Sequence, residues 1–296
     1  MTAGPGVLVV LLVLVAACTP TEVASDDPAE GPAVSRTDDR PNEARTIAYG
    51  DGPEQVADLL LPPGAAPEAG WPTVVLVHGG FWRDQYRRDL MADLAADLAA
   101  RGLATWNVEY RRVGPTGGGV PETLEDVAAA VDHLAEVAAD EPLDTERIAV
   151  AGHSAGGQLA LWLASRGRLP DGAPGGEPGL RPCGVVAQAA VASLVDALEL
   201  GGGAVADFLG GRPDEVPERY ALADPVALVG HGVPTLLIHA DGDATVPLDL
   251  SERYEAAASG AGDPVELVTG PGDHFAVIDP ADPLWATAVD FLDRVC

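Results

Sequence analysis

The chain contains no lysine. All 17 of its basic residues are arginine, and they face 46 Asp and Glu residues, which gives a net charge of −29. A surface this acidic repels phosphate groups, so nucleic acid is excluded as an expected partner. An anionic membrane surface is disfavoured for the same reason. The charge therefore concerns partners and solubility rather than fold.

Cysteine is also scarce, with three residues in a chain of 296. Three cysteines are too few to hold together a small disulfide-rich secreted scaffold. The length and the 47% share of hydrophobic residues instead supply a substantial core, and they exclude a wholly disordered chain. We therefore expect one large globular domain or two small ones.

A hydrophobic run long enough to cross a membrane is missing from the N-terminal region. The apolar run 7–17 has eleven residues, whereas a membrane-spanning helix needs about 20. Its length is that of a signal-peptide core, although residues 1–6 lack the usual positive charge. Residues 15–18, Val-Ala-Ala-Cys, resemble the bacterial lipobox, which implies lipidation of Cys18.

We therefore expect a signal peptide over 1–17 and an exported lipoprotein that faces outward from the cell membrane and touches it only through Cys18. Plain secretion and a cytoplasmic protein with a misassigned start codon are the alternatives. Residues 19–45 combine acids, arginines and prolines without apolar periodicity, a composition typical of a solvated tether. The predicted organisation is a tether over 18–45 and a folded domain over 46–296.

From residue 46 onward, short apolar runs alternate with amphipathic segments. The runs expected to form strands are 55–61, 73–77, 103–108, 147–151, 184–191, 235–239 and 265–269. Helices are expected over 89–101 and 122–138, and another is expected to begin near Ala155. This alternation predicts an α/β fold in which helices cover a mostly parallel sheet.

The strongest chemical signal is Gly-His-Ser-Ala-Gly at 152–156, directly after the predicted strand 147–151. This GxSxG pattern between a strand and a helix is typical of a nucleophile elbow, in which the serine occupies a strained turn. Backbone crowds such a turn, so only small residues fit two positions to either side of the serine. Ser154 is therefore the candidate nucleophile; an incidental serine in a glycine-rich turn is the alternative.

A second signal, His-Gly-Gly-Phe-Trp at 78–82, follows the predicted strand 73–77. Acyl transfer builds negative charge on a carbonyl oxygen, and preorganised backbone N–H groups stabilise that charge. Glycines let the main chain approach the oxygen, so Gly80 and Phe81 are candidate oxyanion-hole donors together with Ala155. We expect His78 to brace the loop rather than to act as a base.

A serine nucleophile needs a base and an orienting acid, which follow it in the order acid and then histidine in this kind of fold. Asp243 follows the predicted strand 235–239, and His274 follows 265–269. Both loops lie at carboxyl ends of strands, where open α/β sheets place their sites. We assign His274 as the base and Asp243 as the acid, with Asp241 as the competing carboxylate.

The other polar residues near these loops favour structural roles. Asp273 is expected to be a turn or surface acid, and His133, His231 and His239 are expected to be structural histidines. A metal site built from His239, Asp241 and Asp243 lacks the spacing of a metal-binding motif. No metal is therefore predicted.

Together these motifs resemble the α/β-hydrolases of the esterase and lipase superfamily over nearly all of 46–296. HGGFW, Tyr110–Arg111 and GHSAG are similar to one subgroup, which contains feruloyl-esterase-like carboxylesterases and kynurenine formamidases. The resemblance implies a mostly parallel sheet of about eight strands with helices on both faces, a lid-like excursion between the sixth and seventh strands, and hydrolysis without a cofactor.

The excursion is expected over 192–233. Loops of this length inside compact domains are often functional. Its Phe208 and Tyr220 are candidates to line a substrate pocket with Trp82, and the alternative is that these aromatics only pack the excursion. The acidic surface favours neutral or cationic small-molecule substrates over anionic ones.

Three functions follow: a serine esterase, a kynurenine formamidase, or a non-catalytic lipoprotein that uses a hydrolase fold for binding. An exported location speaks against the formamidase. In an oxidising compartment Cys183 and Cys296 either form a disulfide at the lower edge of the sheet, or Cys183 is an ordinary buried thiol. The oligomeric state is left open.

Overall fold

The computed structural model describes residues 1, 2, 4 and 43–296. Cys18, the predicted signal peptide apart from residues 1, 2 and 4, and all but the last three residues of the predicted tether therefore lie outside the described residues, and the expectations placed on them stay predictions. Among the described residues, no helix is both long enough and apolar enough to cross a membrane.

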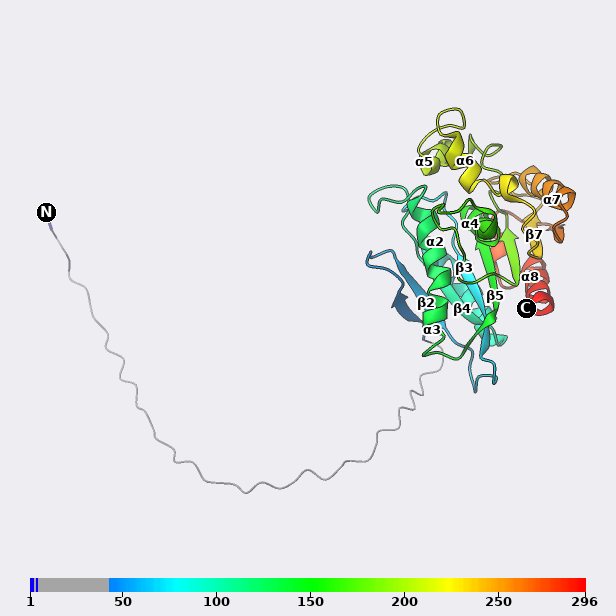
Figure 1. Ribbon diagram of the computed structural model, residues 1–296. Helices are drawn as coiled ribbons and strands as arrows, with labels where there is room; N and C mark the ends of the chain where they lie inside the picture. The colour runs from blue at the N-terminus through cyan, green and yellow to red at the C-terminus, as the bar shows by residue number, and fades with distance from the viewer. Residues whose placement is uncertain (3, 5–42) are drawn as a thin grey trace, which may run out of the picture. The chain divides into compact units, whose positions relative to one another are not determined.

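One sheet of eight strands organises the chain (Figure 1). The strands are β1 (Arg45–Ala48), β2 (Val56–Leu60), β3 (Trp71–Val77), β4 (Ala104–Val108), β5 (Leu143–His153), β6 (Gly184–Gln188), β7 (Thr235–Ala240) and β8 (Val265–Gly270). Their order is β1-β2-β4-β3-β5-β6-β7-β8. The β1–β2 and β2–β4 pairs are antiparallel and all other pairs are parallel. The predicted α/β-hydrolase architecture is confirmed.

Helices lie between most of these strands. The α-helices are α1 (Ala92–Ala100), α2 (Glu122–Asp132), α3 (Leu134–Val137), α4 (Ala155–Ser165), α5 (Ala204–Leu209), α6 (Pro217–Ala223), α7 (Asp249–Ala261) and α8 (Pro283–Val295). The 3₁₀ turns are η1 (Arg88–Met91), η2 (Arg166–Arg168), η3 (Leu200–Gly202), η4 (Pro225–Leu228) and η5 (Ala276–Ile278).

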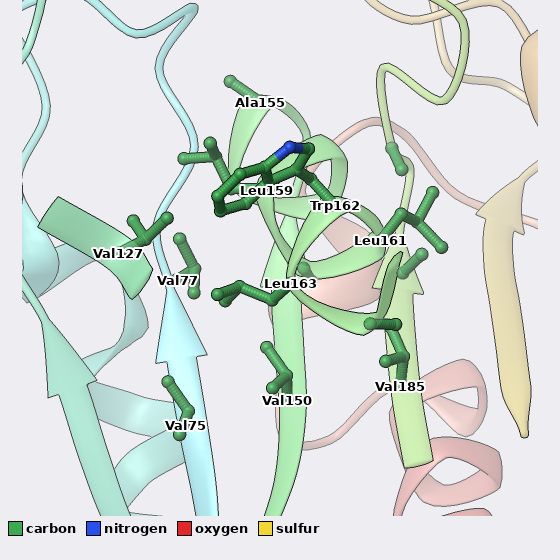
Figure 2. Close-up of a cluster of buried hydrophobic side chains, with 14 of the residues drawn as sticks. Val75, Val77, Val127, Val150, Ala155, Leu159, Leu161, Trp162, Leu163 and Val185 are labelled. Carbon is green, nitrogen blue, oxygen red and sulfur yellow. The ribbon is translucent and has the colours of Figure 1, made fainter. Parts of the chain in front are cut away.

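The sheet is buried on both faces because its central strands are continuously apolar. Val75 and Val77 of β3 point to the face covered by α2, α4 and α7, whereas Val74 and Leu76 point to the face covered by α1 and α8. Figure 2 shows the first of these cores, where Leu159 and Leu163 of α4 lie over the valines of β3, β5 and β6. Two helical layers thus hold the strand ends rigidly.

The excursion between β6 and β7 contains η3, α5, α6 and η4. It is attached to the body of the domain through α4: Trp162 Nε1 donates to Leu222 O at 2.9 Å, and Gln158 Nε2 donates to Ala223 O at 2.9 Å. In Figure 1, α5 and α6 stand beyond the end of the sheet where α4 begins. The excursion therefore borders the edge at which the motif loops emerge.

A disulfide joins Cys183, which precedes β6, to Cys296, which follows α8, with their Cα atoms 5.6 Å apart. This separation lies within the normal range for a disulfide. Of the two alternatives left open by the sequence, the structure therefore shows the disulfide. It ties the C-terminal helix to a central strand.

Reduction of this disulfide is expected to destabilise the domain. The bridge spans 113 residues, and cross-links of this kind typically contribute about 2–4 kcal/mol to the free energy of unfolding. For a domain of this size that corresponds to a fall in Tm of about 5–15 °C. This fall in Tm is measured by thermal unfolding with and without dithiothreitol. The double variant C183S/C296S should lose any response to the reductant, and an equal Tm for the wild type in both conditions would contradict a stabilising bridge.

Candidate active site

Ser154 lies on the tight turn between β5 and α4, with φ 56° and ψ −117°. Such a conformation is strained for any residue except glycine. A Cβ atom on Gly152 would come within 2.1 Å of Gly156 O, and one on Gly156 would come within 2.1 Å of Val77 O. The predicted strand–turn–helix is confirmed, and both glycines are required by the close backbone.

The backbone of Ser154 is anchored to the chain that follows β6. Its N–H donates to Gln188 O at 2.8 Å, and its C=O accepts from the N–H of Val191 at 3.1 Å. These bonds offset the strain of the turn by satisfying both polar groups. The serine is consequently held rigidly at the carboxyl end of β5.

His274 and Asp243 come from the loops after β8 and β7 and meet at that edge. His274 Nδ1 donates to Asp243 Oδ2 at 2.6 Å. Asp243 Oδ1 accepts from the N–H groups of Thr245 at 2.8 Å and Val246 at 2.9 Å. Burial alone would raise the pKa of Asp243, but these hydrogen bonds outweigh it and hold the pKa below its ordinary value. Asp243 is thus an ionised acceptor that orients the imidazole, whereas Asp241 is exposed.

Two further residues near this pair have the supporting roles that the sequence favours. His239 Nε2 donates to Val246 O at 2.9 Å and its Nδ1 lies 2.8 Å from Ser251 Oγ. Burial lowers the pKa of His239, so the ring is neutral and shapes the loop of Asp243. Asp273 Oδ1 accepts from the N–H groups of Phe275 and Ala276, as a turn acid does. In the described residues no group of three or more His, Cys, Asp and Glu side chains is arranged to hold a metal ion.

His153 contacts the candidate base His274, and the sequence did not predict this contact. It is buried, its Nε2 donates to His274 O at 2.9 Å, and its ring centroid lies 4.6 Å from that of His274. Burial lowers the pKa of His153 to about 3, so it stays neutral beside the candidate base. The position of His153 inside the GxSxG motif indicated that it lies near the nucleophile. The sequence could not show its partner, because the loop of His274 lies more than 100 residues away in the chain.

The HGGFW loop lies directly against the elbow. A Cβ atom on Gly79 would come within 3.0 Å of Ser154 Cβ. Gly80, Phe81 and Trp82 all have positive φ, of 115°, 53° and 54°. Three successive residues with positive φ bend the chain sharply in the loop that carries Gly80 and Phe81, whose role as oxyanion-hole donors stays a prediction. Ala155, the third predicted donor, is the first residue of α4.

The aromatic residues proposed for a substrate pocket are buried. The rings of Trp82 and Phe208 stack at 4.4 Å, and their exposed fractions are 0% and 1%. Tyr220 is also buried, and its hydroxyl donates to Gly211 O at 3.2 Å. The structure thus corresponds to the packing alternative: the Trp82–Phe208 stack attaches the excursion to the HGGFW loop, and Tyr220 packs within the excursion.

Two exposed apolar side chains lie beside predicted site residues. Apart from Met1, the large hydrophobic residues that are exposed in the described part of the chain are Tyr86, Val195 and Phe275. Tyr86 packs against Gly80, and the ring of Phe275 lies edge-on to His274 at 5.4 Å. Val195 belongs to the loop that begins beside Ser154.

Comparison with known proteins shows which family and which relatives the chain resembles. Residues 57–257 match the BD-FAE family model. Esterase LipQ of Mycobacterium tuberculosis is 27% identical over 228 residues, which cover 73% of this chain and 52% of LipQ. The isoprenylcysteine alpha-carbonyl methylesterase ICME of Arabidopsis thaliana is 26% identical over 277 residues, which cover 85% of this chain and 60% of ICME. The chain therefore spans between half and two thirds of the length of these relatives.

Among solved structures, a truncated carbohydrate esterase from gut microbiota superimposes with a TM-score of 0.74 at 20% identity. The match covers 90% of this chain and 99% of that one. A likeness at this level of identity concerns the fold alone.

Proposed function

The chain belongs to the BD-FAE family of esterase-like α/β-hydrolases, and from this premise we propose that it hydrolyses carboxylic esters with Ser154 as nucleophile, His274 as base and Asp243 as orienting acid. The observation that carries the proposal is the 2.6 Å hydrogen bond between His274 and Asp243 at the same sheet edge as the strained Ser154. Each side chain comes from the end of a different parallel strand.

In the proposed reaction, Ser154 Oγ attacks the ester carbonyl while His274 Nε2 accepts its proton. Asp243 stabilises the imidazolium that forms, and backbone N–H groups of Gly80, Phe81 and Ala155 stabilise the oxyanion. The intermediate collapses, and the leaving alcohol takes the proton from His274. Water then attacks the acyl-enzyme with His274 again as base, which releases the acid and restores Ser154.

A fluorophosphonate probe tests this proposal, because it phosphonylates only an activated serine. We expect one stable adduct per chain, mapped by peptide mass spectrometry to Ser154, and no adduct after heat denaturation. A chain that merely binds ligands on a hydrolase fold would not react. Comparison of N-formylkynurenine with aryl acetates then separates the formamidase alternative from the esterase.

The pH dependence provides an independent test of the base. The pKa of Asp243 is held below its ordinary value and that of His153 is lowered to about 3, so neither group is expected to produce a titration limb near neutral pH. A protonated His274 cannot accept the serine proton. We therefore expect kcat/KM to fall tenfold per pH unit along a single acid limb. A flat profile from pH 8 to pH 4 would remove histidine from the role.

Charge on the acyl group should affect the rate. A cleft of about 660 Å³ beside Phe275 is lined by Asp93, Asp273, Asp279 and Asp282. It adds to a net charge of −29, so an anionic substrate is repelled. We expect a phenyl acetate to be hydrolysed faster than the corresponding hemisuccinate, with a ratio of kcat/KM that shrinks as salt is added. Faster hydrolysis of the hemisuccinate would contradict the expected preference for neutral or cationic esters over anionic ones.

A further inference from the structure

Glu109, the residue after β4, is a fully buried carboxylate beneath the HGGFW loop. Its Oε1 lies 3.2 Å from His78 Nε2 and 3.3 Å from a guanidinium nitrogen of Arg112. Burial alone would raise the pKa of Glu109, but its hydrogen bond to His78 and the charges of His78 and Arg112 outweigh this and lower the pKa to about 2. Glu109 is therefore ionised and acts only as an acceptor.

His78 transmits this charge to the loop. One ring nitrogen faces Glu109, and the other, Nδ1, donates to Gly79 O at 2.8 Å. A backbone carbonyl can only accept, so Nδ1 carries the hydrogen of the bond to Gly79 O. The ring of Tyr110 stacks on His78 at 4.3 Å and its hydroxyl donates to His78 O at 2.8 Å. The imidazole therefore has one defined orientation.

The bond to Gly79 O also fixes the next N–H group. A trans peptide is planar, with its C=O and N–H pointing in opposite directions. Since the carbonyl of Gly79 is turned toward His78, the N–H of Gly80 is turned away from it. Gly80 is one of the proposed oxyanion-hole donors, and its neighbour Gly79 lies so close to Ser154 that a Cβ atom on Gly79 would come within 3.0 Å of Ser154 Cβ.

Glu109 also holds the other side of Gly80. Its Oε2 accepts from the N–H of Arg88 at 3.2 Å, and Arg112 donates to Tyr86 O. The side chain of Tyr86 in turn packs against the α-carbon of Gly80. One buried carboxylate thus organises the two segments that enclose this glycine.

From these contacts we propose that Glu109 is a positioning residue, which acts through His78 to aim the Gly80 N–H at the oxyanion; the inference rests on the proposed esterase function. Removing one oxyanion-hole donor costs about 10²–10³ in kcat. Misdirecting a donor that is still present should cost less, about 10–100-fold.

Glu109→Gln tests the proposal because it keeps the shape and removes the charge. The readouts are kcat and KM for a neutral aryl ester and the inhibition constant of a trifluoromethyl ketone. Ser154 adds to this ketone and passes its proton to His274, leaving a stable oxyanion in the proposed hole. We expect kcat to fall 10–100-fold with KM changed less than threefold, and the ketone to bind more weakly by the same factor as kcat/KM.

Asp126→Asn is the matched control. Asp126 is equally buried, and its carboxylate pairs with Arg111 and Gln55. The variant Asp126→Asn should lower Tm as Glu109→Gln does, but it should leave kcat and the affinity for the ketone unchanged. If Glu109→Gln does not fold, Glu109→Asp is the second variant, because its shorter side chain moves the charge away from His78. We expect the same result, a lower kcat with a nearly unchanged KM.

A double-mutant cycle adds a second test. His78→Asn retains a donor for Gly79 O and cuts the link to Glu109, so adding Glu109→Gln to it should change kcat by less than threefold. Additive losses, or wild-type kcat and ketone affinity in Glu109→Gln, would overturn the inference. A wild-type enzyme that neither hydrolyses esters nor reacts with a fluorophosphonate would instead refute the proposed function.

Discussion

Alanine in place of Ser154 is expected to lower kcat for a small aryl ester by about 10⁴–10⁶-fold, the scale on which loss of a triad nucleophile acts. The substitution removes only the hydroxyl. Alanine at φ 56° carries the same backbone strain as serine, and the anchoring bonds to Gln188 and Val191 are made by the backbone. Stability should therefore change little while chemistry is lost.

Ser165→Ala is the matched control for that variant. Ser165 ends α4, is 1% exposed, and its hydroxyl donates to Trp162 O within its own helix. It should keep full activity and full labelling by the fluorophosphonate, whereas Ser154→Ala should lose both. Activity within tenfold of the wild type in purified Ser154→Ala, free of contaminating esterases, would mean that another group performs the attack.

Local chemistry explains why much of the fold follows from the sequence. The apolar runs that form β3, β4, β6, β7 and the C-terminal half of β5 are buried on both faces and are flanked by turn residues, so each is recognisable on its own. Strand β1 was not predicted because Arg45–Ala48 is largely exposed and has no apolar run. It forms only because β2 offers a free edge for antiparallel pairing. An edge strand of this kind depends on its neighbour rather than on its own residues.

The residues of the site likewise fall into those that the sequence alone could predict and those that it could not. The elbow glycines could be predicted because the constraint on them comes from residues two positions away. The roles of Trp82 and Phe208 could not, because an aromatic ring lines a pocket or packs a core according to partners distant in the chain. Glu109 and His153 were missed for this reason as well: their partners, His78 and the loop of His274, are brought close only by the folded sheet.

Asparagine in place of Asp243 should be nearly as damaging as loss of the nucleophile, with kcat lowered about 10⁴-fold, the effect measured for the same change in a serine protease triad. The amide oxygen of asparagine can still accept from the N–H groups of Thr245 and Val246, which bond Asp243 Oδ1. The loop is therefore retained, and the amide nitrogen takes the place of Oδ2 opposite His274.

An amide nitrogen donates, so it favours the tautomer in which His274 Nδ1 accepts and Nε2 carries the proton. That tautomer cannot take the proton of Ser154, so the loss should appear in kcat rather than in KM or Tm. Asp241→Asn, two residues earlier on the exposed part of the loop, is the matched control and should keep wild-type kcat. If Asp241→Asn is the inactive variant and Asp243→Asn is not, the orienting acid is the competing carboxylate, and the hydrogen bond between His274 and Asp243 has no part in the reaction.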